Sequence, residues 1–541
     1  MSKEPTRDEL TLSDIDANDK KMIMDAVKNG ISRRDMLTVL GAIGIGAAAG
    51  GSLFTQAGQA VAATPKKGGS VRFASDLHGP SDTLDPQLFT STIDYSRGRA
   101  IYNSLTQFRD SIVPQPELAE EFSANKAVTQ WTFKLKQGVK FHDGSALTAD
   151  DVIWTMNRHT MDGSKSKAKT LVAGVKEWKK IDSHTVKAIM DAPNADLPAV
   201  LATFHFKVLK KDTKDFQAPV GSGPYRLKEF KPGVRSVHVR NDDYWREGGN
   251  FDAIEIFAIT DSVARTNALL SGDIQLMQAL DPKAIKQVEK SPTAKVSSVP
   301  SGAYVGVCCL LNSSPGNNQD FVMAMKHLPR RKRMVKSILK NHGTVGNDHP
   351  INVAYGPDFC KELPVRDHDP DQAKFHLKKS GISSAELHVA EVAPGITDMC
   401  LMVQRDAQKI GLDLKIKKVP NDGYWGAVWM KTPMNVVTWN MRPTANVMLT
   451  LAFAPDAPWN DTFWKNERFG KILKEVRGVT DEAKRHEMYC ELQRLAHDGS
   501  GMVIPMHRNY VDAVAADIHG IPAVPLGALG GAEWPEFAWK A

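Results

Sequence analysis

Short strand-like runs and capped helix-like segments alternate along this chain from residue 70 onward. The run 131–135 (Trp-Thr-Phe-Lys-Leu) alternates apolar with polar side chains, which is the period of a half-buried strand. A helix is predicted soon after it, because Thr148 is a good N-cap and Asp150 and Asp151 suit the positive N-terminal end. Strands and helices that are mixed in this way predict an α/β fold.

Similar signals for the starts and ends of helices recur in the rest of the chain. Asp369 before Pro370 predicts a helix start, and Gly381 predicts its end. Apolar side chains spaced for a helix face occur from 469 to 476, and Thr480 with Asp481 and Glu482 is expected to start another helix. Further strands are expected at 70–74, 236–240, 254–259, 387–392, 412–417 and 436–439. A chain of 541 residues exceeds what one core organises, so we expect two or three domains.

The first sixty residues are typical of an export signal. Arg33 and Arg34 lie in a segment that resembles the twin-arginine motif, with Met36 where that motif usually has Phe. No charged residue follows Met36 until Lys66, and Ala60-Val61-Ala62 has the small-x-small pattern of a cleavage site. We therefore expect residues 1–62 to be a disordered start plus a signal peptide, with the twin-arginine translocase as a partner and the periplasm as the destination. An uncleaved membrane anchor is the alternative, which the many glycines disfavour.

Charge and cysteine content exclude several classes of protein. The net charge of +7 is spread along the chain, and the short basic run 330–333 has no interleaved aromatic residues. We expect this run to be a solvated helix face and the protein not to bind nucleic acid. The five cysteines lack any C-x-x-C spacing, so all five are expected to be free, with Cys308 and Cys309 in a buried strand.

No constellation for catalysis emerges from the sequence. Ser222 lies between two glycines, but the segment is not G-x-S-x-G, and no phosphate-binding P-loop occurs. His342, Asp348 and His349 lie close together in sequence without the spacing of metal ligands on a helix, which favours a solvated loop. We therefore expect a protein that is not an enzyme and that has no cofactor and no bound metal.

An ordered set of motifs extends from residue 68 to about 515 and resembles the dipeptide-, oligopeptide- and nickel-binding proteins of ATP-driven importers, the family 5 extracellular solute-binding proteins. The order of the set makes the resemblance specific, although each motif alone is modest. The motifs are 84–91 (LDPQLFTS), 102–105 (YNSL), 116–120 (PELAE), 131–152 (WTFKLKQGVKFHDGSALTADDV), 220–225 (VGSGPY), 240–245 (RNDDYW), 269–274 (LLSGDI), 369–370 (DP) with Ala373, and 504–505 (IP).

The resemblance implies the two-lobed periplasmic-binding-protein fold of cluster C type. It implies a first lobe of residues 63–305 with 505–541, an extra subdomain in it at about 98–195, and a second lobe of residues 306–504. A solute would bind in the cleft between the lobes, and closure would present it to the permease and ATPase subunits of the importer. We expect the protein itself to be a monomer.

One departure from the family pattern bears on the solute. Where relatives that bind free peptides carry an Asp that pairs with the peptide ammonium group, this chain has Arg442. A cation there disfavours an ammonium group and suits a carboxylate or phosphate; the alternatives are that Arg442 points to solvent or pairs with an acid of the protein. The expected ligand-binding residues are Phe89, Thr90, Ser91, Tyr424, Trp425, Trp439, Asn440 and Arg442.

The function expected from the sequence is capture of a small peptide-like or amino-acid-derived solute, preferably anionic, for an ATP-driven importer. An ordinary di- or oligopeptide-binding protein is one alternative. A metal-chelate or haem-binding importer component is another, and a secreted enzyme is the alternative from a different class.

Overall fold

A computed structural model describes residues 65–421 and 423–541. The predicted export residues Arg33, Arg34, Ala60 and Ala62 lie outside the described residues. The structure has two units, and the smaller one includes an antiparallel pair of β18 (Ile518–His519) and β19 (Trp539–Lys540). The larger unit comprises 69–516 and 521–537. Within the described ranges no helix has the length and apolarity needed to cross a membrane.

A mixed sheet organises the larger unit. Its strands follow one another in the order β15 (Asp413–Lys418), β14 (Ser384–Val389), β16 (Met434–Trp439), β12 (Ala294–Cys309), β17 (Met502–Ala515), β11 (Leu276–Met277), β1 (Ser70–Ser75), β10 (Ala253–Ala258), β9 (Arg235–Arg240) and β8 (Tyr225–Lys231), and β13 (Gly343–Val345) pairs with β17. β1 is parallel to β10 and β11, and β14 is parallel to β15 and β16. The predicted strands exist, although β14 begins three residues before the predicted start at 387.

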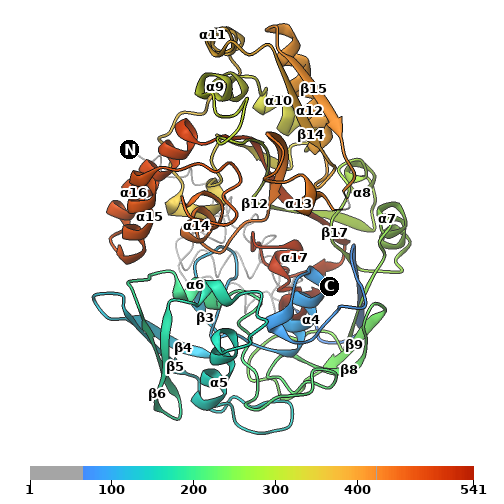
Figure 1. Cartoon of the computed structure of the whole chain (residues 1–541). Helices are drawn as coiled ribbons and strands as arrows, with labels where there is room; N and C mark the ends of the chain where they lie inside the picture. The colour runs from blue at the N-terminus through green and yellow to red at the C-terminus, as the bar shows by residue number, and fades with distance from the viewer. Residues whose placement is uncertain (1–64, 422) are drawn as a thin grey trace, which may run out of the picture. The chain divides into compact units, whose positions relative to one another are not determined.

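The long strands β12 and β17 join the two groups of strands in this sheet (Figure 1). They pair antiparallel from Ala294 opposite Ala515 to Cys308 opposite Met502. The predicted lobe boundaries after residues 305 and 504 fall inside these strands, where Val305 lies opposite Met506. Because β12 and β17 are adjacent and each passes from one group of strands to the other, the chain connects the two groups twice at the same place. The division into two lobes remains a prediction.

A separate four-stranded sheet lies within the predicted subdomain. Its order is β4 (Ala119–Ala124), β5 (Gln130–Leu135), β7 (Thr185–Met190) and β6 (Val175–Asp182). Helix α5 (Ala149–Thr160) covers it, with Val152 and Met156 in the same core as Phe133 (Figure 1). The predicted cap is confirmed, because Thr148 and Asp151 form a reciprocal capping box. Full burial of one such apolar side chain stabilises the fold by about 1.5–3 kcal/mol.

The remaining helices follow their predicted signals closely. Asp369 caps α11 (Pro370–Ser380), and Gly381 ends it with a φ of 70°. The predicted helix start at 480–482 is confirmed, because Asp481 caps α16 (Glu482–Gly499). The other helices are α4 (Thr92–Ile101), α6 (Leu197–Leu201), α7 (Ser262–Ser271), α8 (Ile285–Glu289), α9 (Gln319–His327), α10 (Arg331–Ser337), α12 (Ile396–Lys409), α13 (Tyr424–Ala427), α14 (Ala445–Phe453), α15 (Glu467–Glu475), α17 (Ala528–Gly531) and α18 (Trp534–Phe537). A 3-10 helix η3 (Val353–Asp358) and the short strands β2 (Thr106–Gln107) and β3 (Gln115–Pro116) are also present.

The basic run 330–333 is only partly the solvated helix face that the sequence predicted. Lys332 and Arg333 are exposed as predicted, but Arg331 is buried and donates two hydrogen bonds to the Asp348 carboxylate, at 2.8 and 3.0 Å. Arg366 donates to the same carboxylate at 2.7 Å. Burial acts to raise the pKa of Asp348, but the two guanidinium groups lower it to about 2. Asp348 therefore lies in a buried ion-pair cluster and not in the solvated loop that the sequence predicted.

The cysteines correct a second expectation. Cys360 and Cys490 form a disulfide, so the prediction of five free thiols is wrong for these two. Cys308, Cys309 and Cys400 are free, as predicted, and all three are buried. The two bonded cysteines are separated by 130 residues, and only the packing of the segment after η3 against α16 brings them together. No local spacing could have predicted this bond.

Candidate functional site

A cavity of about 510 Å³ lies in the larger unit, where segments far apart in the sequence meet. The strand β17 supplies one wall through residues 508–512. The other lining residues include Asp76, Thr92, Thr260, Ser262, Arg265, Gln278, Ala279, Leu280, Asp281, Pro282, Ile285, Leu339, His342, Pro394, Asn440 and Ala528. The lining contains both cationic and anionic side chains, so a polar solute suits this space better than an apolar one.

Arg508 of β17 lines this cavity without an acidic partner. Its Nη2 donates to the Thr438 hydroxyl at 3.1 Å, and its buried Nε has no hydrogen-bond partner among the described residues. No carboxylate of the described chain lies within 4.0 Å of its guanidinium group. Burial lowers the pKa of Arg508 from its ordinary value, yet an arginine stays protonated at neutral pH. A buried cation without a counter-ion is costly, and an anionic group would relieve that cost.

Arg442 also lacks an acidic partner among the described residues. It lies three residues beyond the end of β16, is half-buried, and its guanidinium carbon lies 5.4 Å from the centroid of the Trp439 ring. Its backbone N–H donates to the Tyr355 hydroxyl at 3.2 Å, while its Nε is buried without a partner in the described part of the chain. No ion pair of Arg442 occurs with any described acid, so the alternative of internal pairing is not realised in this structure.

The two arginines influence one phenol of the cavity wall. Burial raises the pKa of Tyr510 to about 12, and the positive charges of Arg508 and Arg442 oppose that rise. Burial also raises the pKa of Tyr95 on α4, which Arg442 again opposes. Arg442 therefore acts electrostatically on the same tyrosine of the cavity wall as Arg508, although Arg442 is not among the residues that line the cavity. Arg508 was not predicted from the sequence, because a single Arg in a strand gives no signal of where it points.

The predicted residues with polar side chains lie in or near the cavity. Asn440 is exposed and lines it. Thr90 is exposed, and Ser91 is the residue before α4, where its hydroxyl lies 3.3 Å from the Asp94 carboxylate. The next residue, Thr92, lines the cavity although the sequence did not single it out. Thr90 and Ser91 are not among the residues that line the cavity, so their contact with a solute stays a prediction.

Three of the four predicted aromatic residues belong to the core. Phe89 is fully buried against Gly98 of α4. The Tyr424 hydroxyl donates to the Val436 carbonyl at 2.7 Å, and the Trp439 indole donates to the buried carboxylate of Asp461 at 2.7 Å. The polar atoms of Tyr424 and Trp439 are already paired in the interior, and Phe89 packs there as an apolar side chain. A contact between any of these three side chains and a solute stays a prediction.

Trp425 is the fourth predicted aromatic residue. Its side chain is 45% exposed, and its ring packs edge-on against Tyr424 and Trp429. It is not among the residues that line the cavity. A contact between Trp425 and a solute therefore stays a prediction.

Acidic residues that the sequence did not single out also line the cavity. Asp512 is buried and accepts hydrogen bonds from the backbone N–H groups of Ala279 and Leu529, at 3.0 and 2.6 Å. Burial raises the pKa of Asp512 to about 6. Asp76 and Asp281 also line the cavity. The cavity lining therefore contains acidic side chains as well as Arg508.

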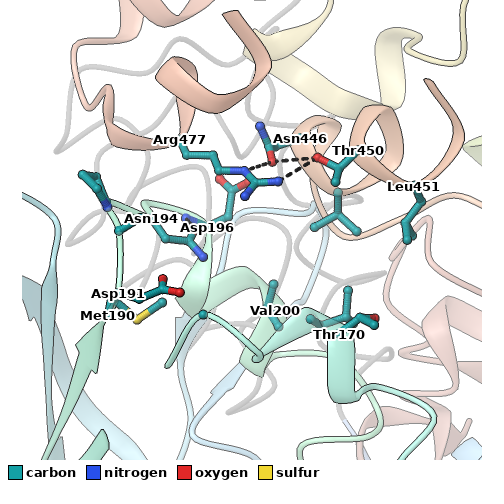
Figure 2. Close-up of a pocket in the computed structure, with 15 residues that line it drawn as sticks. Thr170, Met190, Asp191, Asn194, Asp196, Val200, Asn446, Thr450, Leu451 and Arg477 are labelled. Carbon is teal, nitrogen blue, oxygen red and sulfur yellow. Dashed lines mark hydrogen bonds between the residues drawn. The ribbon is translucent and has the colours of Figure 1, made fainter. Parts of the chain in front are cut away.

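A smaller cavity of about 180 Å³ lies between residues 170–200 and 446–477 (Figure 2). Its Arg477 donates to the Asn446 side chain at 2.8 Å and to the Thr450 hydroxyl at 2.9 Å. Asp196 accepts from the Thr444 hydroxyl at 2.7 Å and from Arg485 at 3.0 Å. These polar groups already hydrogen-bond to protein groups. We therefore interpret this cavity as a place where hydrogen bonds hold the two segments together, and not as a solute site.

The comparisons with known proteins identify the family. Residues 113–460 match the model of the bacterial extracellular solute-binding proteins, family 5. The chain belongs to this family. It is a binding protein and not an enzyme, the solute-binding component of an ATP-driven importer for peptides or related solutes.

Relatives and solved structures agree with this family over most of the chain. The dipeptide-binding protein of Escherichia coli (strain K12) is 25% identical over 497 residues, 83% of this chain and 91% of its own length. The substrate-binding protein CtaP of Listeria monocytogenes matches with a TM-score of 0.78 and 19% identity, covering 88% of this chain and 100% of that chain. The binding protein AgaA of A. tumefaciens R10, solved with agropinic acid, has a TM-score of 0.72 and 20% identity, covering 87% and 99%. The fold is therefore that of the periplasmic binding proteins of cluster C.

Proposed function

We propose that this family member captures a small peptide-like or amino-acid-derived solute whose anionic group binds Arg442 and Arg508. The observation that carries the proposal is that Arg508 lines the cavity, while Arg442, which is not a lining residue, acts electrostatically on Tyr510 of the cavity wall. Each of the two arginines has a buried, unpartnered Nε, and neither is paired with a described acid. A guanidinium group offers a planar fork that suits a carboxylate or phosphate. An ammonium group at the same place would be repelled.

The acidic part of the cavity restricts the solute further. Asp76 and Asp281 line the space that Arg508 also lines. A solute with an ammonium group as well as an anionic group would therefore find opposite charges on both sides. Amino-acid conjugates and modified short peptides have this character. The agropinic acid bound by AgaA, which shares this fold, supports an acidic solute of this class.

Delivery would follow the general behaviour of two-lobed binding proteins. A solute that contacts residues from both groups of strands favours the closed state, because only that state satisfies all of its contacts. The closed complex would then dock on the permease of an ATP-driven importer. Export through the twin-arginine pathway to the periplasm is part of the same proposal, and the basis for it is the segment around Arg33 and Arg34.

Titration calorimetry with a solute found by a thermal-shift screen tests the proposal. Arg442→Ala and Arg508→Ala would each leave a desolvated anion partly unpaired, which weakens binding by about 2–5 kcal/mol, or about 30-fold to several thousand-fold. Arg405 on α12 is exposed and lies outside the cavity lining, so Arg405→Ala is the matched control and should bind as the wild type does.

The ordinary di- or oligopeptide binder is the competing function. It predicts low-micromolar binding of unmodified dipeptides by the wild type and little effect of Arg442→Ala. Either result would overturn the proposed role of the two arginines. The family assignment would stand in both cases, since it does not depend on these side chains.

A further inference from the structure

Four side chains with metal-binding atoms meet at a surface pocket of about 470 Å³ beside α16. They are Cys360, Glu362, His486 and Cys490, and the two cysteines form the disulfide described above. The pocket shares no lining residue with the solute cavity. Glu487 and Glu491 add negative charge to its lining and Arg494 adds one cation, so a positively charged ligand is favoured.

The donor atoms are already close together. The Glu362 Oε2 atom lies 3.6 Å from the Cys360 sulfur and 3.7 Å from the Cys490 sulfur. The His486 Nε2 atom lies 3.1 Å from Glu362 Oε2 and 3.5 Å from the Cys490 sulfur. The two sulfurs and a carboxylate oxygen all lie within 4.8 Å of one another. Two thiolates, one imidazole and one carboxylate are ligand types that Zn²⁺ takes in tetrahedral sites.

The spacings fit such a tetrahedron. Zinc–sulfur bonds of about 2.3 Å and zinc–nitrogen or zinc–oxygen bonds of about 2.0–2.2 Å put adjacent ligand atoms about 3.3–3.8 Å apart. The four separations given above lie in or near this range. The sulfur atoms are the exception, because they are bonded to each other. Breaking that bond would let them separate to the distance that two zinc ligands need.

His486 is oriented as a metal ligand would be. Its Nδ1 lies 2.7 Å from the Pro357 carbonyl oxygen, and a carbonyl only accepts, so Nδ1 carries a proton and donates it. The other nitrogen, Nε2, faces the carboxylate and the sulfur. A backbone carbonyl that fixes the imidazole in this way is the usual support of a metal-bound histidine. His486 and Cys490 are also one helical turn apart on α16, which puts them on one face.

We propose that Cys360, Glu362, His486 and Cys490 bind one thiophilic divalent cation such as Zn²⁺ when the disulfide is reduced. A dithiol reductant supplies two electrons and two protons; the S–S bond breaks, two thiols form, and the reductant becomes a disulfide. Metal binding then displaces the two thiol protons. The disulfide-bonded and metal-bound forms exclude each other, so this surface senses the redox state independently of solute capture.

Cobalt(II) is the probe for the test, because its absorption reports thiolate ligands and tetrahedral geometry. The full chain is reduced with a phosphine, freed of reductant under anaerobic conditions and titrated. Reduced wild type should bind one Co²⁺ with sulfur-to-metal charge-transfer absorption, and Zn²⁺ should displace it. Disulfide-bonded wild type should show no such absorption.

Variants distinguish a site with four protein ligands from metal binding by the two thiols alone. His486→Ala and Glu362→Gln keep both cysteines and should weaken Zn²⁺ binding at least about tenfold. Cys400→Ser removes a buried thiol elsewhere and should bind as the wild type does. Circular dichroism of each variant checks that it is folded. The proposal is wrong if the reduced, folded wild type binds neither metal, or if His486→Ala and Glu362→Gln both bind Zn²⁺ as tightly as the wild type.

Discussion

The indole Nε1 of Trp439 donates a hydrogen bond to the buried carboxylate of Asp461 at 2.7 Å. Trp429 donates to the other oxygen of the same carboxylate, also at 2.7 Å. The centroid of the Trp439 ring lies 5.4 Å from the guanidinium carbon of Arg442. One buried carboxylate therefore fixes the ring beside which the proposed anion-binding arginine lies, and it links the core to the candidate site.

Asp461 should make stability depend on pH. Burial raises its pKa to about 7, although both indole hydrogen bonds oppose the rise. The unfolded pKa is about 3.9, so between about pH 4 and 7 the folded state binds more protons and the contribution of Asp461 to stability falls as pH rises. Relative to Asp461→Asn, the free energy of unfolding of the wild type should fall by on the order of 3 kcal/mol from pH 4 to 8.

Urea denaturation of both proteins at several pH values measures that difference. Asp367 is exposed, so Asp367→Asn is the matched control and should leave the pH dependence unchanged. A constant difference between wild type and Asp461→Asn across this range would show that Asp461 stays ionised.

The buried cluster around Asp348 should be critical for stability. Asp348→Ala would leave Arg331 buried without its carboxylate, which costs about 3–5 kcal/mol. Asp367→Ala removes an exposed partner of Lys332 and should have little effect. The midpoint of urea unfolding is the measurement. Equal midpoints for the two variants would contradict the importance assigned to the buried pair.

Gly98 should not tolerate a methyl group. A Cβ at this position of α4 would lie far inside contact distance of the Phe89 ring, which is itself fully buried. Alanine favours a helix by about 1 kcal/mol over glycine, but overpacking costs about 1–3 kcal/mol, so the net effect of Gly98→Ala should be destabilising.

The control is Gly426→Ala on α13, where a Cβ would meet no atom within 4 Å. This variant should match the wild type in thermal unfolding or exceed it slightly. A Gly98→Ala protein that melts at or above the wild-type temperature would mean that the Phe89 ring shifts without cost.

Export should require the arginine pair. The translocase reads the pair as a signal and not simply as charge, so replacing Arg33 and Arg34 with Lys should leave precursor in the cytoplasm. Cell fractionation followed by immunoblotting measures the periplasmic fraction. Undiminished mature protein in the periplasm of the double variant would exclude the twin-arginine route.

Local signals determined most of the secondary structure. The capping residues Thr148 and Asp369, the stop at Gly381 and the alternation in 131–135 act within one turn or one strand, so they can be recognised without knowledge of the fold. The ordered motifs determined the family in the same way, because their spacing along the chain is itself the signal.

Tertiary structure decided what each side chain does. The sequence marked Trp439 and Arg442 through one motif, yet Asp461 holds the Trp439 ring in the core, while Arg442 stays without an acid. Arg508 reaches the cavity only because β17 passes beside it. Cys360 and Cys490 bond across 130 residues. Burial and pairing depend on distant segments that meet in space, so the sequence alone determined the elements and the family, and the packing of those elements decided which charges and thiols have partners.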